Sequence, residues 1–123
     1  MKLRIRGNSI RLRLLRGEVA EFASTGIVRE IINFGASNLT YILQTADDAN
    51  DLSAKFVDNK IIVSVLPETA QNWTETDLIG LTGEQKNADG GILKITVEKD
   101  FVCRDRLDDE ANRDAYPNTS GKC

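Results

Sequence analysis

Apolar and polar residues alternate along the first fourteen positions of the chain, on both sides of Gly7-Asn8. This alternation has the period of a β-strand, and Gly-Asn tolerates the positive φ that a two-residue hairpin turn requires. With Gly7-Asn8 as the turn, one face of the predicted hairpin is wholly apolar, because Leu3 faces Leu12 and Ile5 faces Ile10. The opposite face sets cation against cation, which destabilises a strand pair. That basic face therefore needs a reason beyond folding.

The same hairpin pattern recurs 51 positions later, with Asp58-Asn59 in place of Gly7-Asn8. The match continues into a predicted helix, where Phe22 corresponds to Trp73, and reaches the last strand if the second copy has three extra loop residues. We interpret this pattern as an internal duplication. The alternative is chance similarity between amphipathic strands, but a single offset shared by hairpin, helix and strand argues against it. The matched apolar positions include Leu3 with Ala54, Ile5 with Phe56, Ile10 with Ile61, Leu12 with Val63 and Leu39 with Leu93.

Each copy is predicted to contain strand, hairpin turn, strand, helix, strand, turn and strand, which indicates a mainly β domain with two short helices. After the first hairpin we expect a helix over 17–24 that Gly26 caps, because glycine is favoured just past a helix end. The second helix is expected to start at Pro67, since proline suits the first helical position. The remaining strands are expected over 27–34, 39–45, 52–57, 60–65, 78–85 and 92–99.

We expect one domain over residues 1–103, with repeat one at 1–46 and repeat two at 52–99, because 123 residues suit a single compact core. Apolar periodicity is lost in residues 104–123, which predicts an acidic, poorly ordered tail. Within that tail we expect Tyr116 to dock on the domain. The only cysteines, Cys103 and Cys123, are too few for a disulfide scaffold.

The formal net charge of −3 is unevenly distributed along the chain. Residues 1–16 carry six basic side chains and no acidic ones, whereas residues 17–99 carry six basic and thirteen acidic. Such a protein is not a general polyanion binder, but its first hairpin offers a local basic surface. No apolar run is long enough to span a membrane and no signal-peptide core follows the charged start, so we expect a cytoplasmic protein without a membrane partner.

This basic surface is the first candidate site. Cations at this spacing suit phosphate contacts, arginine also reads guanine through two hydrogen bonds, and a two-stranded ribbon fits the DNA major groove. The alternative is a solvated outer face that is neutralised by Glu30, Glu84, Glu98 or the acidic tail. The candidate nucleic-acid-binding residues are Lys2, Arg4, Arg6, Asn8, Arg11 and Arg13.

Arg6-Gly7-Asn8-Ser9, followed by Arg13-Leu14 and a short helix, resembles the DNA-binding half of AbrB/MazE-type swapped-hairpin proteins. The second copy keeps a Leu66-Pro67 ending and Asp77-Leu78 after its helix. In that family two chains interleave hairpins to form one small barrel. The resemblance covers residues 1–99 and implies that this chain holds both halves as an intramolecular, closed swapped-hairpin β-barrel. The whole chain also resembles a group of short bacterial proteins of unknown function.

Two other kinds of site receive less support from the sequence. The tail contains thiols and carboxylates, but without histidine or a Cys-x-x-Cys pair their spacing predicts no metal site. The sequence leaves open whether Cys103 and Cys123 are free thiols, a disulfide or metal ligands. Ser9 and Ser64 have no histidine to activate them, and no phosphate-binding glycine loop is present, so we expect no enzymatic activity and no cofactor. The tail residues in question are Cys103, Asp105, Asp108, Asp109, Glu110, Asp114 and Cys123.

The sequence therefore predicts a non-enzymatic protein that binds duplex DNA through its first hairpin, in the manner of a regulator or an antitoxin. The acidic tail would then serve as a protein-binding arm. The alternative is a protein-interaction module whose basic face binds an acidic partner or the protein's own tail. We expect a monomer or a weak homodimer.

Overall fold

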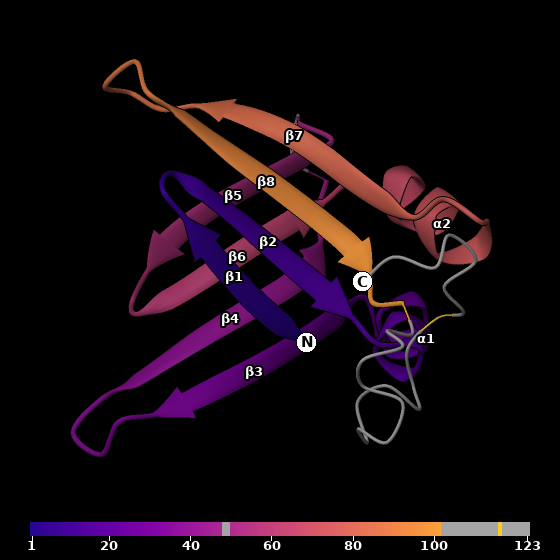
Figure 1. The fold of residues 1–123 in the computed structure, drawn as a ribbon, viewed down its shortest axis with the longest axis horizontal. Coiled ribbons are helices and arrows are strands. Elements are labelled where there is room, and N and C mark those ends of the chain that lie inside the picture. Colours follow the sequence, from indigo (N-terminus) through magenta and orange to yellow (C-terminus); the bar gives the residue numbers. More distant parts are fainter. Residues whose placement is uncertain (48–49, 102–115, 117–123) are drawn as a thin grey trace.

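The computed structural model describes residues 1–47, 50–101 and 116. The described residues form two four-stranded sheets and two helices, in the element order that the sequence predicts (Figure 1). The mainly β fold with two short helices is thus confirmed. The elements are β1 (Lys2–Arg6), β2 (Ser9–Leu14), α1 (Arg16–Thr25), β3 (Ile27–Asn33), β4 (Asn38–Thr45), β5 (Leu52–Val57), β6 (Lys60–Val65), α2 (Pro67–Glu75), β7 (Gly80–Lys86) and β8 (Ile92–Lys99).

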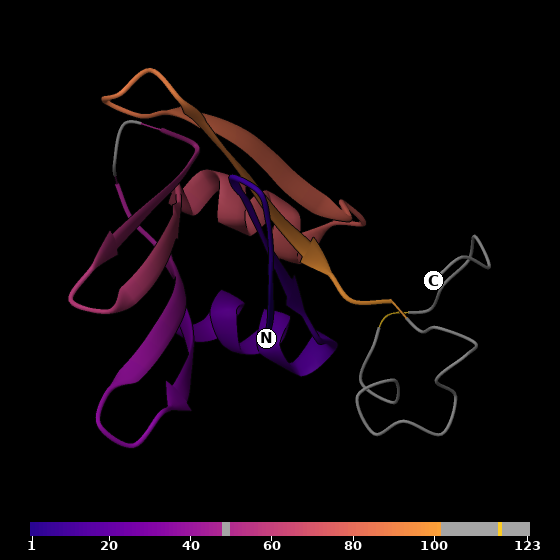
Figure 2. The same ribbon diagram turned by 60° about the vertical axis from the view of Figure 1, so that its left-hand side comes forward.

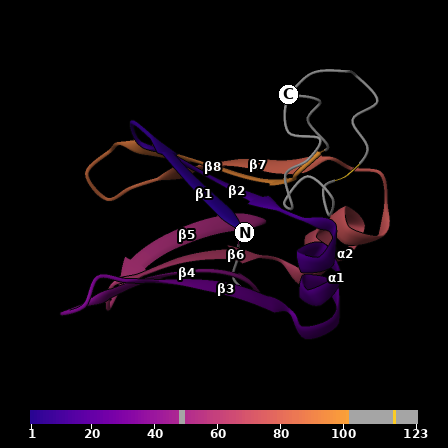
Figure 3. The ribbon, with the colours of Figure 1, turned by 60° about the horizontal axis from the view of Figure 1, so that its bottom comes forward.

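Each sheet combines one hairpin from each half of the chain. The first sheet has the order β1-β2-β8-β7 and the second has the order β3-β4-β6-β5. Hairpins pair antiparallel within themselves, whereas the two central contacts, β2 with β8 and β4 with β6, are parallel. The sheets lie face to face, and both helices lie at one end of them, opposite the hairpin turns (Figure 3). The halves therefore exchange hairpins.

The register of the two sheets follows the repeat. Ser9 pairs with Lys94 in the first sheet, and Lys60, its counterpart in the second repeat, pairs with Thr40 in the second sheet. Backbone hydrogen bonds repeat in the same way: the Lys94 amide donates to the Asn8 carbonyl at 3.1 Å, and the Thr40 amide donates to the Asn59 carbonyl at 3.1 Å. Equivalent residues thus make equivalent main-chain contacts in the two halves.

The core is built from the apolar faces of both sheets and from the buried side chains of each helix. Phe22 in α1 and Trp73 in α2 are 2% and 0% exposed, and their rings meet edge to face with centroids 6.1 Å apart. The two helices therefore lie next to each other through equivalent residues (Figure 2). Gly26 ends α1 with a φ of 80°, as the sequence predicts, and its amide donates to the Phe22 carbonyl at 2.8 Å.

The expectation of a closed barrel is corrected, because the described strands form two separate sheets. Side chains join the sheet edges where a barrel would have a backbone ladder. Between β5 and β7, the Gln85 amide accepts from the Ala54 N–H at 2.8 Å and donates to the Ala54 carbonyl at 2.9 Å. Just before β1, the Met1 carbonyl accepts a hydrogen bond at 2.8 Å from the hydroxyl of Tyr41 on β4 of the second sheet. Such bridges hold the edges together without continuing the strand pairing.

Tyr116 packs on the domain, as expected from the sequence, although the rest of the predicted tail at 104–123 lies outside the described residues. The Tyr116 amide donates to the Asp100 carbonyl at 2.6 Å. Its ring meets the Phe101 ring at 5.7 Å and lies 5.4 Å from the Arg16 guanidinium and 5.4 Å from the Lys99 ammonium. These contacts connect the tail to the start of α1 and the end of β8.

Removing residues 104–123 is expected to leave cooperative unfolding intact, because the buried apolar core residues in the part of the chain that the structure describes lie between Met1 and Val97. The loss of the Tyr116 contacts should lower the free energy of unfolding by about 2 kcal/mol, the sum of the lower values for one hydrogen bond, one ring pair and two cation–π contacts. Urea unfolding of the truncated protein checks this, with Tyr116→Ala as the matched variant. A truncated protein without a cooperative transition would contradict the prediction.

Candidate nucleic-acid interface

The tip of the β1–β2 hairpin carries the exposed part of the basic face. Gly7 adopts a φ of 55° in the turn, as a tight hairpin requires. Arg4 and Arg6 are exposed, and neither forms an ion pair with any described residue. Together with Ser9 and Arg11, they line a cavity of about 140 Å³. The Ser9 hydroxyl donates to the Arg6 carbonyl at 2.6 Å, so its oxygen lone pairs remain free to accept a hydrogen bond.

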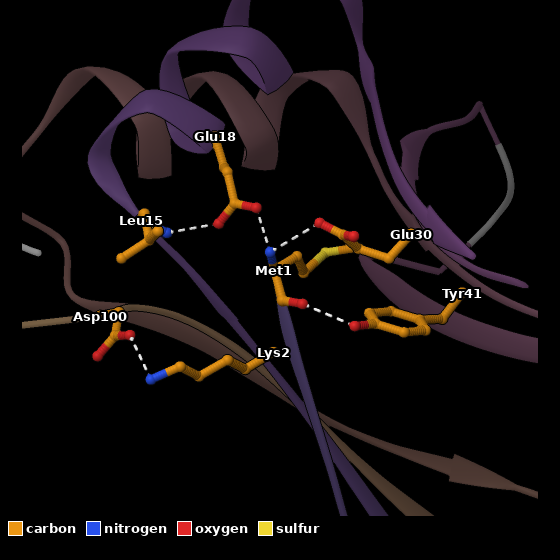
Figure 4. Close-up of polar contacts among 7 residues, drawn as sticks. All are labelled: Met1, Lys2, Leu15, Glu18, Glu30, Tyr41 and Asp100. Carbon is orange, nitrogen blue, oxygen red and sulfur yellow. Dashed lines mark hydrogen bonds and ion pairs between the residues drawn. The ribbon is translucent and has the colours of Figure 1, made fainter. Parts of the chain in front are cut away.

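The base of the same hairpin is neutralised by acidic residues. Glu98 Oε1 lies 2.6 Å from Arg13 Nε and 3.6 Å from Arg11 Nη1. The Lys2 ammonium lies 3.3 Å from the buried carboxylate of Asp100 (Figure 4). The predicted face is therefore divided. Lys2, Arg11 and Arg13 have acidic partners, as the solvated-face alternative expects of Glu98, whereas Arg4 and Arg6 have none among the described residues.

Asn8 anchors the hairpin turn to the other half of the chain. Its side-chain amide donates to the Ile92 carbonyl at 2.7 Å, and its own carbonyl accepts from the Lys94 amide at 3.1 Å. Asn8 thus holds the tip against the start of β8, and its amide nitrogen already has a partner. In this geometry Asn8 positions the arginines of the tip.

Lys94 is a further cation of this surface that the sequence prediction omitted. The parallel pairing of β2 with β8 places it directly beside Ser9, and Glu84 on β7 is its other neighbour. Ser9 and Lys94 belong to opposite halves of the sequence, and only the exchange of hairpins between the repeats makes them adjacent. A sequence analysis that had aligned β2 with β8 in the exchanged arrangement could therefore have placed Lys94 beside Ser9 at the tip.

The equivalent surface of the second sheet is much less basic. Lys55 and Lys60 occupy the places of Arg4 and Ser9, but Val57 and Ile62 stand where the first hairpin has Arg6 and Arg11. Asp58 and Asn59 form the second turn with φ values of 52° and 62°. The duplication thus carries one basic hairpin tip and one that is mixed.

A second polar cluster surrounds the first residue and fixes β1 in place. The Met1 ammonium contacts the carboxylates of Glu18 and of Glu30, the latter at 3.1 Å (Figure 4). Glu18 also accepts a hydrogen bond from the Leu15 amide at 2.8 Å. Burial raises the pKa of the nearby Tyr41 hydroxyl, and the negative charges of Glu30 and Glu18 raise it further. The hydroxyl therefore stays protonated and donates to Met1.

The sequence analysis also considered metal-ligating residues in the tail and a serine nucleophile. The tail residues considered for a metal lie outside the described residues, and within the described part of the chain no group of three or more potential metal ligands occurs. Ser64 is buried, and its hydroxyl accepts a hydrogen bond from Gln44 Nε2 at 3.2 Å. No helix in the described ranges is long and apolar enough to cross a membrane.

The fold and this surface define a mainly β protein with two hairpin-exchanging halves and one basic hairpin tip. The chain belongs to a family of unknown function, DUF7009, whose model matches residues 1–120. This match agrees with the resemblance to a small family of unknown function. No curated protein and no solved structure matches the chain.

Proposed function

We propose that the protein binds duplex DNA through the tip of the β1–β2 hairpin. The observation that carries the proposal is the cavity lined by Arg4, Arg6, Ser9 and Arg11, where two exposed arginines have no acidic partner among the described residues. The Arg4 and Arg6 guanidinium groups, which have no acidic partner among the described residues, would form charge-assisted hydrogen bonds with a bound phosphate. The resemblance to swapped-hairpin DNA-binding proteins supports the same ligand.

In this proposal the two ends of the hairpin have different tasks. Arg4 and Arg6 contact backbone phosphates, and the two-stranded ribbon is narrow enough to enter the major groove. Lys2 and Arg13, which are paired with Asp100 and Glu98, hold the ribbon on the sheet. The acidic remainder of the protein then confines DNA to the tip.

A salt series with mixed-sequence duplex DNA tests the proposal. The logarithm of the binding constant should fall by about 0.9 per logarithmic unit of salt for each phosphate neutralised. The double variant Arg4→Ala/Arg6→Ala should bind more weakly and lose about 1.8 units of slope, the share of two phosphate contacts. The fold should persist because both side chains are exposed.

Lys55→Ala is the matched control, since Lys55 is the counterpart of Arg4 in the second hairpin. It should leave the slope nearly unchanged. DNA binding is wrong if the wild-type protein does not retain duplex at low salt, or if the double arginine variant has the same slope as the wild type.

The second candidate is a protein-interaction module whose basic face meets an acidic partner or the tail. It is favoured by the contact between Tyr116 and Arg16, which brings one tail residue to the basic segment. Association with an acidic protein, together with no retention of duplex DNA at low salt, would favour this function.

A further inference from the structure

The second sheet ends in a strand, β3, whose outer edge is not bonded to any other described strand. It lies along the lower border of that sheet in Figure 1. The hydrogen bonds that flank the β3–β4 pair are 2.9 Å long: the Thr45 amide donates to the Gly26 carbonyl, and the Phe34 amide donates to the Ser37 carbonyl. Bonded pairs alternate along an antiparallel ladder, so the even-numbered residues of β3 face β4. The odd-numbered residues direct their backbone N–H and C=O groups outward.

Most of these outward backbone groups have no partner among the described residues. Ile27 is the exception, because the Thr25 hydroxyl accepts from its N–H at 3.3 Å and donates to its C=O at 2.9 Å. No described residue bonds the outward backbone groups of Arg29, Ile31 and Asn33. Strand β1 does not cover them, since it diverges from β3 toward the hairpin turns (Figures 1 and 3). This edge can therefore accept another strand.

The equivalent edge in the first sheet, formed by β7, carries a charge where β3 has an exposed isoleucine. Glu84 pairs with Lys94 on β8, and Ile31 pairs with Thr40 on β4, so Glu84 and Ile31 occupy equivalent places in the two repeats. Charged side chains on an edge strand oppose pairing with another chain. The β7 edge thus has a protection that β3 lacks at Ile31.

The two remaining edges, β1 and β5, are protected in other ways. Lys2, Arg4 and Arg6 place cations along β1, which repel a second copy of the same strand. On β5, the Ala54 backbone is already bonded to the Gln85 side chain. Over residues 29–33, β3 has neither a row of like charges nor such a bond.

A second copy of β3 fits this edge in an antiparallel register centred on Ile31. Ile31 then pairs with Ile31 of the second copy, and Arg29 of each copy pairs with Asn33 of the other. These are the residues with unpaired outward groups, so every such pair can exchange both of its N–H···O=C bonds. A register centred on Arg29 would instead set two guanidinium groups opposite each other, which destabilises a strand pair.

Apolar side chains meet on both faces of the combined sheet in this register. Ile31 is 59% exposed and lies on the outer face, because Val28 is a core residue and side chains alternate along a strand. Ile32 is 40% exposed and lies on the inner face, where the two copies become diagonal neighbours. Pairing therefore removes exposed isoleucine surface from water in both copies.

We propose that β3 is the interface through which two copies of this chain form a two-fold symmetric dimer, with their second sheets joined into one. One strand pair buries little area, so the dimer dissociates on dilution. This dimer does not depend on DNA binding.

Sedimentation equilibrium of the full chain over a concentration series tests the dimer. The wild type should show a concentration-dependent equilibrium between monomer and dimer. Ile31→Glu, which introduces the residue type of the equivalent place on β7, should weaken dimerisation at least about tenfold, because two facing carboxylates replace an apolar pair. Ile79→Glu is the matched control, since Ile79 is 56% exposed and lies outside β3, and it should dimerise as the wild type does.

Disulfide trapping tests the register and keeps the proposal falsifiable if Ile31→Glu does not fold. In a chain that carries Cys103→Ser and Cys123→Ser, Ile31→Cys should form a covalent dimer on mild oxidation, because directly paired positions lie within disulfide reach. Arg29→Cys should not, since position 29 faces position 33 of the other copy. A wild type that is monomeric at every concentration, which would leave the edge to a strand of another protein, or equal trapping of the two cysteine variants, would overturn the proposal.

Discussion

Trp73→Ala is expected to lower the free energy of unfolding by about 3–5 kcal/mol, the range for a large aromatic side chain truncated in a core. Trp73 is 0% exposed, and its indole N–H donates to the Ile79 carbonyl at 3.0 Å. Its ring packs against Phe22 and lies 5.9 Å from the Lys99 ammonium. Truncation would empty the space where the two helices meet and leave these contacts unmade.

Denaturant unfolding measures this loss, and Asn72→Ala on the exposed side of α2 is the matched control. The free energy of unfolding of Asn72→Ala should stay within about 0.5 kcal/mol of the wild-type value, as is usual for a surface substitution. Trp73→Phe should lower the free energy of unfolding by less than Trp73→Ala does, because it retains an aromatic ring against Phe22. A loss below about 1 kcal/mol for Trp73→Ala would contradict the central position of this residue.

Of the substitutions considered, Glu18→Ala is expected to have the second largest effect and to lower the free energy of unfolding by about 2–3 kcal/mol. Removing one partner of a buried ion pair costs about 3–5 kcal/mol, and the 21% exposure of the Glu18 side chain together with the remaining Glu30 contact reduces that figure. The substitution also removes the acceptor of the Leu15 amide at the start of α1. The same denaturant series measures the loss.

Thr69→Ala is the control for Glu18→Ala, because Thr69 is the counterpart of Glu18 in the second repeat. Its hydroxyl lies 3.4 Å from Asp51 Oδ1, a long and exposed contact, so its loss should be small. Equal effects of the two substitutions would mean that the Met1 cluster does not stabilise the fold.

Much of the local structure was predictable from residue patterns. Alternation around Gly7-Asn8 and Asp58-Asn59 predicted both first hairpins, and Pro67 and Gly26 marked a helix start and a helix end. The predicted strand over 78–85 instead runs from Gly80 to Lys86. These signals are local, since turn geometry and helix capping depend on a few neighbouring residues.

The state of the basic face was not predictable from the hairpin alone. Alternation places Arg4 and Arg13 on the same face, but only the pairing of β2 with β8 brings Glu98 to Arg13 and Lys94 to Ser9. The same holds for the outer edge of β3, which is exposed because the exchanged hairpins place β3 at the border of the second sheet. Charge pairing and the exposure of an edge are set by residues that are distant in sequence.

The sequence by itself determined the elements, their order and the repeat, because periodicity, turn residues and caps act over a few positions. Tertiary structure alone decided that the edges of the sheets are joined by side chains such as Gln85 and Tyr41, and that the hairpins form two sheets in place of a closed barrel. It also decided which arginines are paired and which are exposed. These outcomes depend on which strands become neighbours, and contacts between residues far apart in the chain set that choice.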